Sequence, residues 1–110
     1  MRYIKKAKER GFETILLFFW LNSVELAIER VKIRVLEGGH DIPLETIKRR
    51  YDRGLNNFFN LYQNVVDNWM FINNSGVKYK EIAQGTGNEV IIYEREAWHE
   101  IKKEYGQKFI

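Results

Sequence analysis

Residues 13–39, ETILLFFWLNSVELAIERVKIRVLEGG, decide the fold, because an unbroken apolar run is followed by a periodic helix and a Gly-Gly stop. The apolar run covers residues 15–21 and is far too short to span a bilayer. Apolar residues at both odd and even positions indicate a strand that is buried on both faces, as in a parallel sheet. We therefore expect a core strand over residues 13–21.

The next segment has the signals of an amphipathic helix. Asn22 is the expected N-cap, with Glu25 completing a capping-box-like pair, and the helix is expected to run to about Glu37. Gly38 and Gly39 then stop it. Apolar residues at helical spacing predict a core-facing stripe of Val24, Ala27, Ile28, Val31 and Val35.

Helices are also expected on either side of this unit. Upstream, residues 2–10 predict a short basic helix that ends at Gly11. Downstream, Pro43 suits the first turn of the next helix, and Asp41 is its expected cap. Gly54 leaves open whether this is one long helix or two. Its expected buried face consists of Leu44, Ile47, Tyr51, Leu55, Phe58 and Tyr62.

The last third of the chain alternates strand and turn signals. Residues 69–73 predict a strand that ends in the Asn-Asn-Ser-Gly turn at 73–76. Residues 79–83 and 89–93 flank Gly-Thr-Gly-Asn and predict a hairpin, and residues 94–105 predict a final helix. The whole pattern indicates an α/β fold with a short mixed sheet and flanking helices, in a single domain of residues 1–110.

Composition limits the classes of function. The chain has no Cys, which excludes disulfides and thiolate metal sites, and 45% hydrophobic residues argue against disorder. A net charge of +3 is too mild to indicate nucleic acid by itself. The basic residues 1–10 and the apolar run after them resemble a signal peptide. However, Glu9 and Glu13 interrupt the positive charge, and no small-residue cleavage site follows. We expect a cytoplasmic protein with no membrane or nucleic-acid partner.

The two central helices carry arginines that lack acidic neighbours. Arg30 and Arg34 lie one turn apart on one helix, and Arg34 has only Glu37 at an interacting spacing. On the next helix, Arg50 and Arg53 have no acidic residue three or four positions away. A bound phosphate would relieve the repulsion between these cations, and guanidinium groups bind phosphate bidentately. The alternative is a solvated basic face, and the residues alone leave both interpretations open.

Other candidate residues give weaker signals. His40 lies in the connector between the two helices, where it could contact a phosphate or a base, or simply cap a turn. His99 stands alone, and neither central helix has the spaced His and acidic residues of a metal site, so we expect none. A lone Gly-x-Gly at 85–87 lacks the context of a dinucleotide site. Strand aromatics could stack bases, but they are more typical of a core: Trp69, Phe71 and Tyr93.

Several motifs together resemble one protein family. They are Phe18–Leu21, the helix residues 23–31 with Arg34 and Val35, the Gly-Gly-His-Asp-Ile-Pro run at 38–43, and Arg49-Arg50-Tyr51 with Arg53-Gly54-Leu55. These residues are similar to those of the zeta-toxin-like P-loop kinases, also described as predicted ABC-type ATPases. The same pattern continues with Tyr62, Asp67, Trp69 and the Asn-Asn-Ser-Gly run at 73–76. The likeness therefore extends over nearly the whole chain and corresponds to the C-terminal half of such a kinase.

The resemblance implies an α/β P-loop kinase fold that transfers the γ-phosphoryl group of ATP, with Mg²⁺, to a hydroxyl of a small molecule such as a nucleotide sugar. By resemblance, Arg34 and Arg50 are the catalytic candidates that contact phosphates. Arg30, His40 and Arg53 are the candidates that bind the cofactor behind them.

The chain departs from the family in one large respect. It contains no G-x-x-x-x-G-K-[ST] motif and lacks the segment that would supply the catalytic base. We therefore expect that the chain alone binds ATP weakly or not at all and does not turn over. Its expected partner is a P-loop-containing N-terminal half, or an antitoxin. The alternatives are a non-catalytic remnant or interaction module, which could form a homo-oligomer, and a nucleic-acid-binding domain that uses the same arginines.

Overall fold

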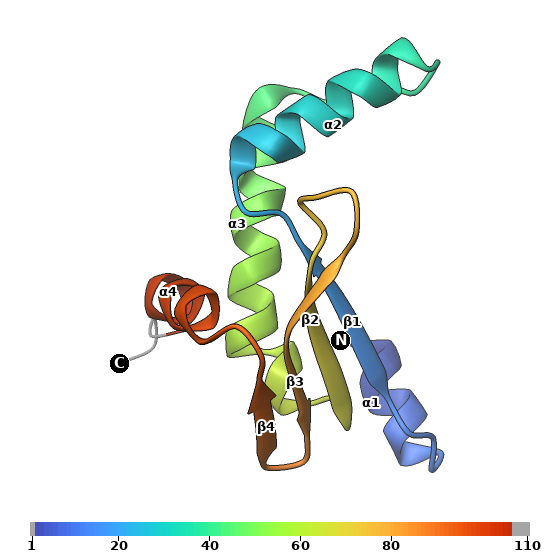
Figure 1. Cartoon of the computed structure of the whole chain (residues 1–110). Helices are drawn as coiled ribbons and strands as arrows, with labels where there is room; N and C mark the ends of the chain where they lie inside the picture. Colours follow the sequence, from blue (N-terminus) through green and yellow to red (C-terminus); the bar gives the residue numbers. More distant parts are fainter. Residues whose placement is uncertain (1, 107–110) are drawn as a thin grey trace.

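The computed structural model describes residues 2–106, and it shows a four-stranded mixed sheet flanked by helices (Figure 1). The predicted α/β class with a short mixed sheet is therefore confirmed. Met1 and residues 107–110, which the single-domain prediction includes, lie outside the described residues. In chain order the elements are α1 (Arg2–Glu9), β1 (Ile15–Trp20), α2 (Val24–Leu36), α3 (Leu44–Asn60), the 3₁₀ turn η1 (Tyr62–Asn64), β2 (Asn68–Asn73), β3 (Lys80–Thr86), β4 (Glu89–Ile92) and α4 (Arg95–Tyr105).

The sheet has the strand order β1-β2-β3-β4. β1 pairs with β2 in parallel, and α2 and α3 form the crossover that this pairing requires. β2, β3 and β4 are antiparallel neighbours. The predicted hairpin is confirmed with a tighter turn than expected, because Gly87 adopts φ +61° and lets the chain reverse over Gly87 and Asn88 alone.

One face of the sheet carries the core, which α3 and α4 cover (Figure 1). Phe58 of α3 and Phe71 of β2 are completely buried, with ring centroids 5.1 Å apart. Trp98 of α4 stacks on Trp69 of β2 at 5.4 Å. Of the strand aromatics, Trp69 and Phe71 are thus core residues, whereas Tyr93 is 51% exposed.

The other face of β1 is uncovered, so the prediction of a strand buried on both faces is wrong. Ile15, Leu17 and Phe19 are 66%, 51% and 55% exposed, whereas the residues between them turn toward the core. β1 is an edge strand, and its apolar residues alternate between a covered and an open face. The run of apolar residues therefore indicated the strand but not how many faces of it are packed.

The helix boundaries agree with the sequence to within one or two residues, but two of the caps do not. Ser23, not Asn22, caps α2, because the Ser23 hydroxyl accepts a hydrogen bond from the Leu26 amide. Asp41 does not cap α3 either, since its carboxylate accepts from the neighbouring Ile42 amide and Pro43 occupies the N-cap. The question left open at Gly54 is resolved, because α3 is one continuous helix.

Helix α2 is less buried than its apolar stripe predicts. None of its residues is fully buried, and the stripe residues from Val24 to Val35 are only half-buried. Its C-terminus is well defined: Gly38 has φ +98°, and the Gly39 amide donates to the Arg34 carbonyl at 2.7 Å. This is the Schellman arrangement, and it confirms the predicted Gly-Gly stop. It also fixes the helix turn that carries Arg34.

Asp67 ties the start of β1 to the start of β2. Its carboxylate accepts from the Thr14 amide at 2.7 Å and from the Thr14 hydroxyl at 3.0 Å, and Lys8 lies 3.5 Å away. The hydrogen bonds from Thr14 lower the pKa of Asp67. Because the pKa of Asp67 is lower in the folded than in the unfolded chain, this stabilisation is complete above the pKa of an unfolded aspartate, which is near 4. It is lost as the pH falls below that value.

We therefore expect urea denaturation of the wild type to show a free energy of unfolding that falls below about pH 4. In Asp67→Asn this fall should be smaller. In the asparagine variant the group cannot titrate, so its stability should depend less on pH across this window. An unchanged pH profile in Asp67→Asn would contradict the assignment.

Gly85 of β3 has no room for a side chain. A Cβ atom there would lie 2.2 Å from the Trp69 indole nitrogen. We expect Gly85→Ala to destabilise the fold by about 1–3 kcal/mol through overpacking. Gly76→Ala is the matched control, since its nearest contact would be an ordinary 3.7 Å. Thermal unfolding should separate the two variants, and equal midpoints would contradict this packing.

Candidate phosphate site

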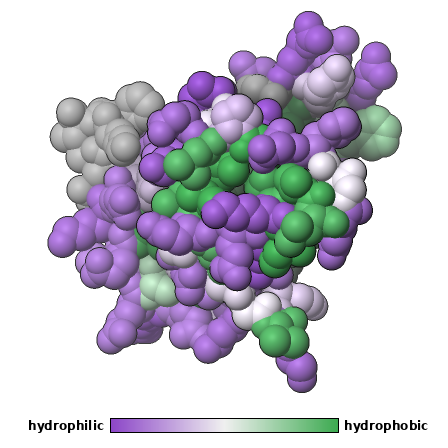
Figure 2. All heavy atoms as spheres, turned by 90° about the horizontal axis from the view of Figure 1, so that it is seen from above, coloured by the Kyte–Doolittle hydropathy of each residue, from purple (hydrophilic) through white to green (hydrophobic). Residues whose placement is uncertain are grey.

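A cavity of about 380 Å³ lies where α2 and α3 meet the carboxyl end of β1. Three of the predicted cations line it: Arg30, Arg34 and Arg50. Figure 2 views the molecule from this end, and it shows apolar side chains (green) gathered in the middle and crossed by hydrophilic ones (purple). The cavity therefore combines three guanidinium groups with an apolar wall.

Each arginine is positioned by its helix. Arg30 and Arg34 are one turn apart on α2, and Arg50 projects from the first half of α3. Arg34 lies in the last turn of α2, where the helix dipole favours a cation. The Gly-Gly stop and Pro43 reverse the chain between the helices, which brings arginines 16–20 positions apart in sequence to one cavity.

The three arginines have no acidic partner within residues 2–106. The ion pairs in this part of the chain are Lys8–Asp67 and Lys80–Glu94, and both lie elsewhere. Arg30 is half-buried, whereas Arg34 and Arg50 are exposed at the mouth. Three unpaired guanidinium groups around one cavity repel one another, and an anion between them would offset that repulsion.

The wall of the cavity is mainly apolar. It includes Phe19 and Leu21 at the end of β1, with Ile42 and Ile47 from the connection to α3. Tyr51 links α3 to the end of β1, because its hydroxyl donates to the Leu21 carbonyl at 2.6 Å. Burial raises the pKa of Tyr51, so the phenol remains a neutral donor at physiological pH.

The position of the cavity in the sheet is that of a ligand site in α/β proteins. β1 and β2 are parallel, so their carboxyl ends meet at the same edge of the sheet. Asn74 directly follows β2 and lines the cavity, and its backbone amide donates to the Trp20 carbonyl. Ligands of open α/β sheets bind beyond the carboxyl ends of the strands.

The two remaining predicted residues do not join the cavity. His40 lies exposed in the connector, and Arg53 lies exposed one turn beyond Arg50 on α3. The structure therefore groups Arg30, Arg34 and Arg50 and leaves His40 and Arg53 outside. Three further residues that line the cavity were not predicted as site residues: Phe19, Tyr51 and Asn74. Their signal in the sequence is their place in the motifs of the family resemblance, and the parallel pairing of β1 with β2 brings Asn74 to the cavity.

Two properties of the described residues concern metal ions and membranes. They contain no group of three or more His, Cys, Asp or Glu side chains placed to hold a metal ion. No helix among residues 2–106 combines the length and apolarity needed to cross a bilayer.

Comparison with known proteins gives little about function. No protein-family model matches the sequence, and no solved structure matches it significantly. The chain is similar to an uncharacterized protein of Haemophilus influenzae, with 44% identity over 48 residues. This stretch covers 44% of the chain and spans about a third (34%) of the relative.

Proposed function

We propose that this chain is the phosphate-facing, C-terminal part of an ATP-dependent kinase of the zeta-toxin-like kind, which phosphorylates a hydroxyl of a small molecule. The observation that carries the proposal is the cavity at the carboxyl end of β1, where Arg30, Arg34 and Arg50 converge without an acidic partner in the described part of the chain. The sequence resemblance supports it independently, because Arg34 and Arg50 are the residues it assigns to phosphate contact.

The arginines would act through electrostatics. Phosphoryl transfer spreads negative charge over the equatorial oxygens, and fixed guanidinium groups stabilise that charge without further reorganisation. Arg34 and Arg50 approach from different helices, so together they can contact one phosphate from two sides. Arg30 is the most buried of the three and would hold the inner oxygens.

The residues present fit the phosphates of ATP but not a magnesium ion. The arginines supply donors for an anion, and Phe19 with Ile42 supplies an apolar surface beside them. In contrast, the described residues offer no cluster of carboxylates for Mg²⁺. Any magnesium chemistry would therefore depend on groups outside this set of residues.

The site would be completed by a P-loop polypeptide. β1 has a free backbone edge and an open apolar face, which are features that soluble proteins usually cover. A partner that adds a strand beside β1, and also packs a helix on the open face of the sheet, would cover Ile15, Leu17 and Phe19 and place its own phosphate-binding loop near the arginine cavity. Without such a loop, the chain would bind ATP weakly.

The experiment that tests this function pairs the chain with the polypeptide encoded directly upstream, if that reading frame carries G-x-x-x-x-G-K-[ST]. We expect ATP hydrolysis or phosphoryl transfer only from the pair. Arg34→Ala should lower the rate about 100-fold or more, and Arg53→Ala, outside the cavity, should change it little. A pair that associates but does not bind ATP would refute the kinase proposal.

A specific observation favours a second candidate, a non-catalytic module that self-associates. The exposed row of Ile15, Leu17 and Phe19 on an edge strand is suited to pairing with another copy. In that case we expect sedimentation to show a concentration-dependent dimer that Leu17→Glu disrupts. A monomer at all concentrations would count against this candidate and leave the β1 surface available to a different partner.

A further inference from the structure

We propose that the edge of β4, beside α4, binds an extended segment of another protein that carries alternating apolar residues and a carboxylate. The segment would add a fifth strand to the sheet. This surface lies at the opposite edge of the sheet from β1, so the proposal does not depend on the kinase function.

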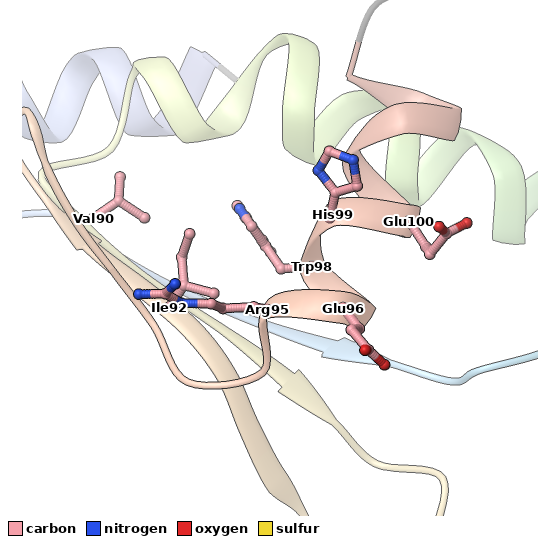
Figure 3. A pocket seen from close by; sticks show the side chains of 7 residues that line it. All are labelled: Val90, Ile92, Arg95, Glu96, Trp98, His99 and Glu100. Carbon is pink, nitrogen blue, oxygen red and sulfur yellow. The ribbon is translucent and has the colours of Figure 1, made fainter.

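A groove runs between β4 and α4 with a volume of about 810 Å³ (Figure 3). Val90 and Ile92 form its strand side, and they lie on the same face of the sheet as the core, since they pair with Gly85 and Ala83. Both remain partly open, at 47% and 39% exposed. α4 covers the core residues of this face but does not extend over the end of β4.

The backbone at this edge is free to pair. The Tyr93 amide donates to the Ile82 carbonyl, so Tyr93 and the other odd-numbered residues of this strand direct their backbone amide and carbonyl groups toward β3. In an antiparallel strand the alternate residues direct theirs the other way. Val90 and Ile92 therefore present their amide and carbonyl groups to the open edge while their side chains line the groove.

The charge on the strand side of the groove favours an anionic segment. Arg95, Glu96, His99 and Glu100 all line the groove, but in Figure 3 the Arg95 side chain extends from α4 toward Ile92, whereas Glu96 and Glu100 point away from β4. Arg95 is in neither of the ion pairs found among residues 2–106. A guanidinium that is directed over an apolar groove and lacks a carboxylate partner is complementary to a peptide carboxylate.

Trp98 closes the floor of the groove. Its ring stacks on Trp69, and in Figure 3 it extends from α4 toward Val90 with the indole nitrogen at its far end. The strand side of the groove thus combines a free edge, two apolar side chains and one nearby cation, whereas Glu96, His99 and Glu100 contribute to its lining from α4. This combination is typical of recognition by strand addition, in which main-chain bonds supply affinity and alternate side chains supply specificity.

The probe is the peptide acetyl-Thr-Val-Thr-Val-Thr-Glu-amide with a fluorescent label, which places two Val and one Glu on one face of a strand. We expect fluorescence anisotropy to show saturable binding at about 0.1–1 mM. A peptide of the same composition with the alternation scrambled should bind at least about tenfold more weakly. Two N-methylated versions of the peptide test the backbone pairing. Methylation of the alternate amides that face β4 should abolish binding, whereas methylation of the amides that face solvent should not.

Two pairs of variants locate the site on the protein. Ile92→Ala should weaken binding about threefold or more, whereas Ile91→Ala, on the other face of β4, should not. Arg95→Gln should weaken it about tenfold, whereas Lys102→Gln, on the same helix but outside the groove, should not.

Three results would overturn the proposal: no saturable binding, equal effects of both N-methylation registers, or equal effects within either variant pair. A fourth would be a dimer of the free protein that Ile92→Ala dissociates, since the groove would then hold a second copy of this chain.

Discussion

Phe58→Ala is expected to remove a large part of the folding free energy of this protein. Phe58 is completely buried, and its ring contacts those of Phe18, Phe59, Trp69, Phe71 and Trp98 at centroid distances between 5.0 and 6.5 Å. Truncating such a side chain costs about 3–5 kcal/mol. Because small domains have only about 5–15 kcal/mol in total, we expect the variant to unfold at a much lower urea concentration than the wild type.

Urea denaturation followed by tryptophan fluorescence measures this effect, since Trp69 and Trp98 both contact the Phe58 ring. Phe12→Ala is the matched control, because Phe12 is 66% exposed and its loss should cost no more than about 0.5 kcal/mol. Ordinary surface substitutions change the free energy of unfolding by about 0.5 kcal/mol. If the free energy of unfolding of Phe58→Ala lies within about 1 kcal/mol of the wild-type value, a core centred on this ring is contradicted.

The second large effect concerns the arginine cavity. We expect the double variant Arg34→Gln with Arg50→Gln to reduce the weak binding of inorganic tripolyphosphate by the isolated chain to an undetectable level, because each hydrogen bond to a charged group contributes about 1.5–3 kcal/mol. Isothermal titration calorimetry at low ionic strength is the measurement. Binding to the wild type should weaken as salt is added, since part of the attraction is screened.

The control for this variant removes the same charge from the same two helices. Lys32 of α2 and Arg53 of α3 are both exposed, and neither lines the cavity. Lys32→Gln with Arg53→Gln should therefore weaken binding only about twofold to threefold, through the change in net charge. Equal losses in the two double variants would indicate a diffuse basic surface in place of a site.

Most of the fold could be predicted because the signals that determine it are local. The Gly-Gly stop after α2, Gly11 after α1 and the Gly87 turn each require a backbone conformation that glycine adopts readily, so the sequence marks these boundaries directly. The cap of α2 was misplaced by one residue, because Asn22 and Ser23 are both good caps and only the hydrogen bond to Leu26 distinguishes them.

The burial of β1 could not be predicted in the same way. A run of apolar residues predicts that a strand is apolar on both sides, but whether both sides are packed depends on which elements lie against it. Here Leu16, Phe18 and Trp20 pack against the core, and the alternate residues of β1 do not.

The candidate site was only partly predictable for a related reason. Counting acidic neighbours along each helix identifies Arg30, Arg50 and Arg53 as unpaired, but it cannot tell which arginines of α3 turn toward α2. The structure selects Arg50 and leaves out Arg53, because one turn of α3 separates their positions and only the first lies beside α2. Tyr51 was expected on the buried face of α3, but its bond to Leu21 is a tertiary contact that no spacing reveals.

The most direct test of the central claim is a titration of the isotopically labelled chain with inorganic tripolyphosphate, followed by amide chemical shifts in NMR spectra. The arginine cavity predicts that the largest shifts occur in three segments that are distant in sequence, around Arg34, around Ile42 to Arg50, and at Asn74. Shifts confined to the lysines of α1, or spread evenly over all basic residues, would contradict a phosphate site at the carboxyl end of β1.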